Sequence, residues 1–74
     1  MHDIFGVLEY GSIVASDNER GWVITYNGSC TFNVWRVCAS GEFDAIECFT
    51  RYEATASTAR AIAAAWLDDL GGES

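Results

Sequence analysis

The chain has 74 residues, is 50% hydrophobic and 14% aromatic, and carries 11 acids against four arginines for a net charge of −7. This length predicts a single domain, residues 1–74, and the aromatic content excludes a disordered chain, since disordered chains lack apolar side chains to bury. Four scattered cations among so many acids exclude the basic patch that binds nucleic acid or an anionic membrane surface.

Residues 2–10 are compatible with a short strand or a helical turn. Beyond them, runs of β-branched and aromatic residues lie between glycine-containing turns and predict strands at residues 12–15, 22–26, 31–38 and 43–49. Asn27-Gly28 predicts a type I′ hairpin turn because both residues tolerate a positive φ, and Ser40-Gly41 closes the next hairpin. We therefore expect an antiparallel meander.

The C-terminal part predicts one long helix over residues 51–70, which ends at Gly71-Gly72. Thr50 and Glu53 have the spacing of a capping box, and alanine, the best helix former, dominates up to Ala65. The helical residues expected to face the sheet are Tyr52, Ala56, Ala59, Ile62, Ala63, Trp66 and Leu70. The other side carries Arg60, Ala61, Ala64, Ala65 and Asp68, where small side chains permit close approach by another backbone. The expected fold class is α+β, a three- to four-stranded antiparallel β-meander followed by one long C-terminal α-helix packed on one sheet face.

Both faces of the predicted sheet are apolar. In the simplest register Cys38 lies opposite Phe43, and Arg36 lies diagonal to Glu47. One helix can cover only one face. Three apolar residues of the other face would stay exposed unless another segment or another chain packs on them: Trp35, Val37 and Ile46. The alternatives for that cover are residues 2–10, a second copy of the chain, or a different protein. A homodimer would form through this face or through an exposed edge of strand 22–26.

The sequence predicts no enzyme, no cofactor and no metal site. Its only histidine is His2, so a cysteine nucleophile has no base within the folded part of the chain. The odd number of cysteines (Cys30, Cys38 and Cys48) and the lack of a C-x-x-C pair predict free thiols that are buried as small hydrophobic side chains in a reducing cytoplasm. An acid close to the N-terminus and the lack of a long apolar run predict a soluble cytoplasmic protein.

The segment from Phe49 to Ala54, which leads to Ala59, Ile62 and Ala63 after a meander, resembles the ββ(β)α layout of half-RNase-H-like antitoxins and of the arm-binding domains of phage integrases. The integrase domains use a basic sheet, from which this acidic chain departs. In size, acidity and lack of lysine, the chain resembles phage-encoded inhibitors of bacterial immunity, the anti-CRISPR proteins. That resemblance implies an interaction protein and assigns no role to any residue.

Charge, size and resemblance together predict a small acidic inhibitor of phage or mobile-element type, which occludes a basic nucleic-acid-binding surface of a host complex of CRISPR type. The alternative is an antitoxin-like or regulatory module that binds a small basic toxin. In both cases the partner is a basic protein or ribonucleoprotein in the bacterial cytoplasm, and the chain contacts neither nucleic acid nor membrane directly. The residues expected to bind the partner are Asp17, Glu19, Trp35, Glu42, Asp44, Asp68 and Asp69.

Overall fold

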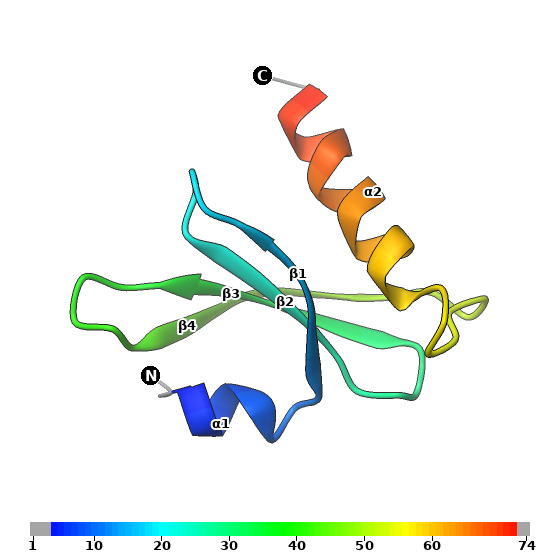
Figure 1. Cartoon of the computed structure of the whole chain (residues 1–74), viewed down its shortest axis with the longest axis horizontal. Helices are drawn as coiled ribbons and strands as arrows, with labels where there is room; N and C mark the ends of the chain where they lie inside the picture. Colours follow the sequence, from blue (N-terminus) through cyan, green and yellow to red (C-terminus); the bar gives the residue numbers. More distant parts are fainter. Residues whose placement is uncertain (1–3, 73–74) are drawn as a thin grey trace.

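A computed structural model describes residues 4–72 and places one four-stranded sheet between two helices (Figure 1). The elements in chain order are α1 (Ile4–Leu8), β1 (Ser12–Asp17), β2 (Trp22–Tyr26), β3 (Thr31–Val37), β4 (Phe43–Thr50) and α2 (Ala59–Gly72). The strands are antiparallel and follow one another across the sheet in the order β1-β2-β3-β4. The expected α+β class and the meander are therefore confirmed, with four strands.

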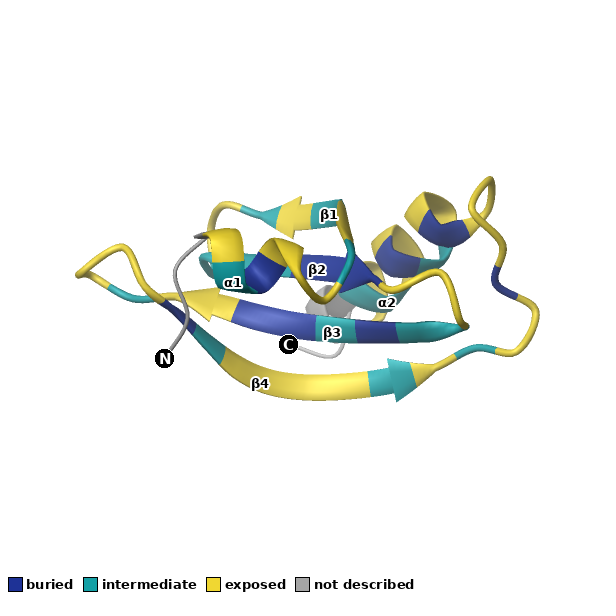
Figure 2. Cartoon of the chain, turned by 90° about the horizontal axis from the view of Figure 1, so that it is seen from below, coloured by how far each residue is buried: buried dark blue, intermediate teal, exposed yellow. Residues whose placement is uncertain are grey.

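The two helices lie on opposite faces of the sheet. Figure 2 shows α1 in front of the strands and α2 behind them. Residues 2–10 were compatible with a strand or a helical turn. Residues 2 and 3 lie outside the described part of the chain, and Ile4–Leu8 form a short helix that covers part of the second apolar face. Strand β2 has a neighbour on each side, so the expected exposed edge of strand 22–26 does not exist and the free edges are β1 and β4.

The larger core lies between the sheet and α2 and contains a chain of aromatic rings. Phe32, Phe49 and Trp66 stack nearly parallel, with centroid separations of 4.9 Å between the first two rings and 4.8 Å between the last two. Tyr26 extends this stack on the Phe32 side at 4.8 Å, and Trp22 extends it on the Trp66 side at 6.2 Å. Because such pairs add about 0.5–1.5 kcal/mol each beyond burial, the stack ties α2 to β2, β3 and β4.

The smaller core lies between the sheet and α1. Val7 and Trp35 are 0% and 1% exposed, and Phe43 packs against them. The Trp35 indole Nε1–H donates a hydrogen bond of 3.0 Å to Thr25 Oγ1, so the buried hydroxyl of Thr25 has a hydrogen-bond partner. The ring of Tyr10 lies 5.1 Å from that of Trp35.

One extra residue in β4 changes the predicted register. Phe32 pairs with Phe49 and Val34 with Glu47, as the predicted register requires, but beyond Val34 the pairing shifts by one residue. Val37, not Cys38, lies opposite Phe43. Since a shift of one residue exchanges the faces, the bulge turns Phe43 toward the α1 core. It also places Arg36 opposite Asp44 instead of diagonal to Glu47, and that part of the prediction was wrong.

The predicted start of the C-terminal helix was also wrong. Residue Thr50 ends β4, residues 51–58 form turns, and α2 begins at Ala59, so the helix is shorter than expected. The capping box forms between Thr55 and Thr58, where each backbone N–H donates to the hydroxyl of the other, at 2.9 and 3.3 Å. Tyr52, expected to face the sheet, is 88% exposed.

The sheet-facing side of the helix is otherwise largely as predicted. Ala59 and Ala63 are buried in the larger core, and Ile62 and Trp66 pack against it. Ala56 precedes the helix and is exposed, and the side chain of Leu70 lies outside the described residues. Leu67 completes the apolar side in its place.

The hairpin between β2 and β3 forms, but with a longer turn than Asn27-Gly28 predicts. The Asn27 N–H donates to the Thr31 carbonyl oxygen at 3.1 Å, which leaves residues 28–30 between them. The Asn27 side-chain oxygen accepts from the Ser29 N–H at 2.7 Å. Cys30 has a φ of 67°, in the left-handed region that few side chains adopt, and this added residue replaces the type I′ geometry.

The two candidate caps make a direct test of where the helix begins. We expect Thr55→Ala to lower the free energy of unfolding by about 1 kcal/mol, because the first turn loses its cap. Thr50→Ala, at the exposed end of β4, should change it by less than about 0.5 kcal/mol. Urea unfolding of both variants measures the difference, and a larger loss for Thr50→Ala would contradict the observed helix start.

Candidate partner-binding groove

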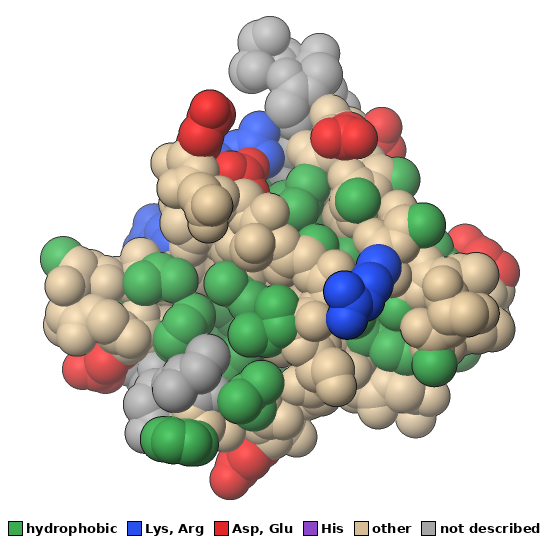
Figure 3. Space-filling view, viewed as in Figure 1, with side chains coloured by type: hydrophobic (Ala, Val, Ile, Leu, Met, Phe, Trp, Pro, Cys, Tyr) green, Lys and Arg blue, Asp and Glu red, His purple; other side chains and the backbone are tan. Residues whose placement is uncertain are grey.

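A groove of about 690 Å³ lies between the β1–β2 turn and α2. Figure 3 shows acidic side chains on both sides of the hollow between these two elements. Its lining consists of Val14, Ala15, Ser16, Asp17, Asn18, Glu19, Arg20, Arg60, Ala64, Leu67 and Asp68. Three of the seven predicted partner-binding residues thus meet in one place, although they come from distant parts of the sequence: Asp17, Glu19 and Asp68.

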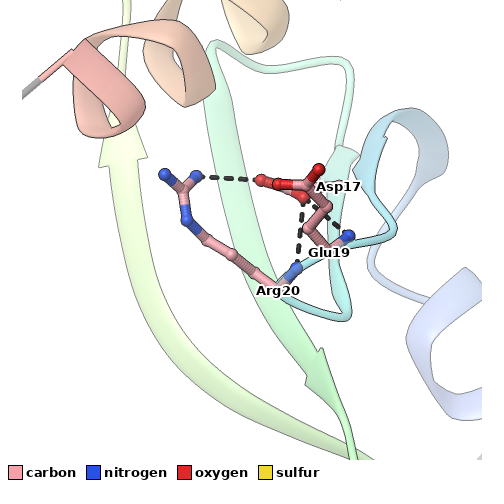
Figure 4. Close-up of polar contacts among 3 residues, drawn as sticks. All are labelled: Asp17, Glu19 and Arg20. Carbon is pink, nitrogen blue, oxygen red and sulfur yellow. Dashed lines mark hydrogen bonds and ion pairs between the residues drawn. The ribbon is translucent and has the colours of Figure 1, made fainter. Parts of the chain in front are cut away.

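The turn at one end of the groove is held by the Asp17 carboxylate (Figure 4). Oδ1 accepts hydrogen bonds from the backbone N–H groups of Glu19 and Arg20 at 3.0 and 3.2 Å, and Oδ2 accepts from Arg20 Nη1 at 2.9 Å. The Arg20 guanidinium also lies 5.2 Å from the ring centroid of Trp22. Asp17 is therefore occupied in forming the turn, whereas the Glu19 side chain is exposed.

The other wall is one stripe of α2. Arg60, Ala64 and Asp68 recur every four residues and so lie one above another on the helix, with Leu67 beside them. Among residues 4–72, neither Arg60 nor Asp68 forms a salt bridge. Asp69 follows on the exposed helix surface, outside the groove lining.

Two further predicted residues, Glu42 and Asp44, lie apart from the groove at the β3–β4 hairpin. Glu42 is exposed, and Asp44 faces two neighbours. Its Oδ2 accepts a hydrogen bond from the Cys38 thiol at 3.1 Å and lies 3.8 Å from Arg36 Nη2. The hydrogen bond to Asp44, with smaller effects of burial and of the nearby negative charge, raises the pKa of the Cys38 thiol.

Trp35, expected to be an exposed contact residue, is buried beneath α1 and is not available to a partner. Other apolar side chains are exposed instead: Phe5, Leu8, Tyr10, Ile13, Val37, Ile46 and Tyr52. Phe5 is 75% exposed on the outer side of α1. A homodimer through the α1 side of the sheet would therefore have to use exposed residues such as Phe5 and not Trp35.

Comparisons with protein-family models, with curated proteins and with solved structures find no match to this chain. Within residues 4–72, no helix is long and apolar enough to cross a bilayer. Over the same residues, no group of three or more histidine, cysteine or acidic side chains is placed to hold a metal ion. Cys30, Cys38 and Cys48 are free thiols, as expected, but none is fully buried.

The acids of the groove could be identified from the sequence, but the packing that brings them into one groove could not. The stripe of Arg60, Ala64 and Asp68 was visible as a four-residue spacing opposite the apolar side of the helix. Leu67 and the edge of β1 were not, because their exposure to the groove depends on where α2 packs.

The contact between Cys38 and Asp44 predicts slow reaction of this thiol. Because the thiolate is the nucleophile and the pKa of Cys38 is raised, less thiolate forms at about pH 8.5 than for an ordinary cysteine. Asp44→Asn should lower the pKa and speed alkylation of Cys38 by iodoacetamide several-fold, as followed by mass spectrometry of the Cys38 peptide. Glu47→Gln, which removes an acid of the same strand that does not affect Cys38, should leave the rate unchanged; equal rates in wild type and Asp44→Asn would contradict the assignment.

Proposed function

We propose that this chain is a small acidic inhibitor that binds a basic, nucleic-acid-binding surface of another protein or ribonucleoprotein and occludes it. The observation that carries the proposal is the convergence of Glu19 and Asp68, from opposite ends of the chain, on one groove. Both side chains are exposed and form no salt bridge among the described residues, so their charges remain available to lysine and arginine.

The charge of the whole chain supports the same partner. At a net charge of −7, the chain attracts basic surfaces and repels nucleic acid, so it competes with phosphate for the same cations. Asp69 is a further exposed acid of α2 outside the groove lining, and Glu42 is an exposed acid at the separate β3–β4 hairpin. Such a partner fits an inhibitor encoded by a phage or mobile element that acts on a host complex in the bacterial cytoplasm.

Capture from a bacterial lysate tests this proposal. The immobilised chain should retain a nucleic-acid-binding protein or ribonucleoprotein, which double-stranded DNA or RNA then releases. Glu19→Lys/Asp68→Lys should abolish most of the capture, because the cations of the partner would then meet cations.

The matched control is Glu47→Lys/Glu53→Lys, which makes the same change in net charge at two exposed acids outside the groove. This control should retain the partner. Equal loss with both double variants would mean that net charge alone attracts the partner. A captured partner that nucleic acid does not displace would contradict occlusion.

A further inference from the structure

The groove has a property that an acidic surface alone does not have, because one of its walls is the free edge of the sheet. β1 pairs only with β2, and the consecutive residues Val14 to Asp17 all line the groove. An edge strand presents alternate backbone N–H and C=O groups without a strand partner. The bulge in β1 lies between Ile13 and Ala15, so the regular part of this edge is Ala15–Asp17.

The opposite wall leaves room for another backbone. Ala64 lies midway between Arg60 and Asp68 on the groove side of α2 and is exposed. The stripe from Arg60 to Asp68 spans about 12 Å at 1.5 Å per residue, which is the length of about four extended residues. The strand edge from Val14 to Asp17 and this helix stripe thus face one another across the groove.

The charged side chains are arranged in a fixed order along the groove. Figures 1 and 2 show β1 and α2 running the same way, with the C-terminal half of α2 beside the β1–β2 turn. Glu19 and Asp68 therefore mark the turn end of the groove, and Arg60 marks the other end. Between them the lining includes Ser16 and the apolar side chains of Ala15, Ala64 and Leu67.

We propose that the groove binds an extended segment of the partner, which adds to β1 as an antiparallel fifth strand and carries the pattern basic-x-apolar-x-acidic. An antiparallel segment enters with its N-terminal end at the turn, so its basic residue meets Glu19 and Asp68. Since alternate side chains point the same way, its third residue faces Ala64 and its fifth meets Arg60. This inference rests on the proposed function for the nature of the partner, and on the open edge of β1 for the manner of binding.

A peptide probe tests the manner of binding without the partner. The probe is the heptapeptide Thr-Arg-Thr-Val-Thr-Glu-Thr, acetylated and amidated, and the control is the same composition in the order Thr-Glu-Thr-Val-Thr-Arg-Thr. Titration into the ¹⁵N-labelled full chain should shift the amide resonances of β1 and of the groove side of α2, with the first peptide binding at least about tenfold tighter. Exchanging the groove charges with Arg60→Glu/Asp68→Arg should reverse this preference.

Two further comparisons separate strand addition from charge attraction. One version of the probe is N-methylated at Arg, Val and Glu, and a second version at the two Thr residues between them. Only one of the two versions should lose binding, because the N–H groups of alternate residues face β1. Ala64→Arg should block the probe, whereas Ala65→Arg, an exposed alanine with the same charge change outside the groove lining, should not.

The proposed strand addition is overturned if no shifts occur at about 1 mM peptide, if the two peptide orders bind equally, or if both methylated sets still bind. It is also overturned if the shifts fall on the β3–β4 hairpin. These outcomes leave the proposed function standing when lysate capture still depends on Glu19 and Asp68. Conversely, the probe could bind at β1 while lysate capture does not depend on these acids. That result would support strand addition at the groove and contradict the proposal of a basic partner.

Discussion

The position of α2 depends on one packing interaction, the insertion of Trp66 between Phe49 of β4 and Trp22 of β2. The rest of the sheet-facing side of the helix consists of Ala59 and Ala63, which are buried and contribute little apolar area, and of Ile62 and Leu67, which pack against the core. Aromatic side chains bury about 150–250 Å² each, so the stack supplies most of what holds the helix in place. The Arg51 guanidinium lies 5.0 Å from the ring centroid of Phe49 and adds a cation–π contact to the stack. Because the same helix forms one wall of the groove, these rings also set the width of the groove.

The strands were predictable because their composition and the turns between them are local signals. The start of α2 was not, since residues 50–58 contain two possible caps and local sequence does not choose between them. Two tertiary contacts determine the helix start. β4 continues to Thr50, which lets Phe49 join the stack. The Tyr26 hydroxyl donates to the Ala54 carbonyl oxygen at 3.3 Å, which holds the turn before the helix. The bulge in β4 was equally invisible, because no residue type marks the position of one extra residue in a strand.

The candidate site was predictable in its charges and not in its geometry. Exposed acids can be chosen from composition and turns, but which of them share a surface depends on contacts between residues far apart in the chain. Glu19 and Asp68 meet because the β1–β2 turn and α2 lie on the same side of the sheet. Asp17 and Asp44 are instead occupied by Arg20, Arg36 and Cys38, which are local or cross-strand contacts that a list of acids does not reveal. Trp35 was misassigned for a similar reason, since a five-residue helix covers it.

The two cores are unequal, and this inequality determines the order in which the molecule opens. Between the sheet and α1 the buried side chains are Val7, Thr25, Trp35 and Phe43, whereas the other face carries the aromatic stack and the buried side of α2. Local opening follows the weakest set of contacts, and a helix as short as α1 has no stability of its own. The α1 layer therefore forms the first cooperative unit to detach, ahead of global unfolding. In that partly open state the sheet and α2 remain native while the Trp35 side of the sheet faces solvent, so amide hydrogens of residues 4–10 exchange before those of β2 and β3.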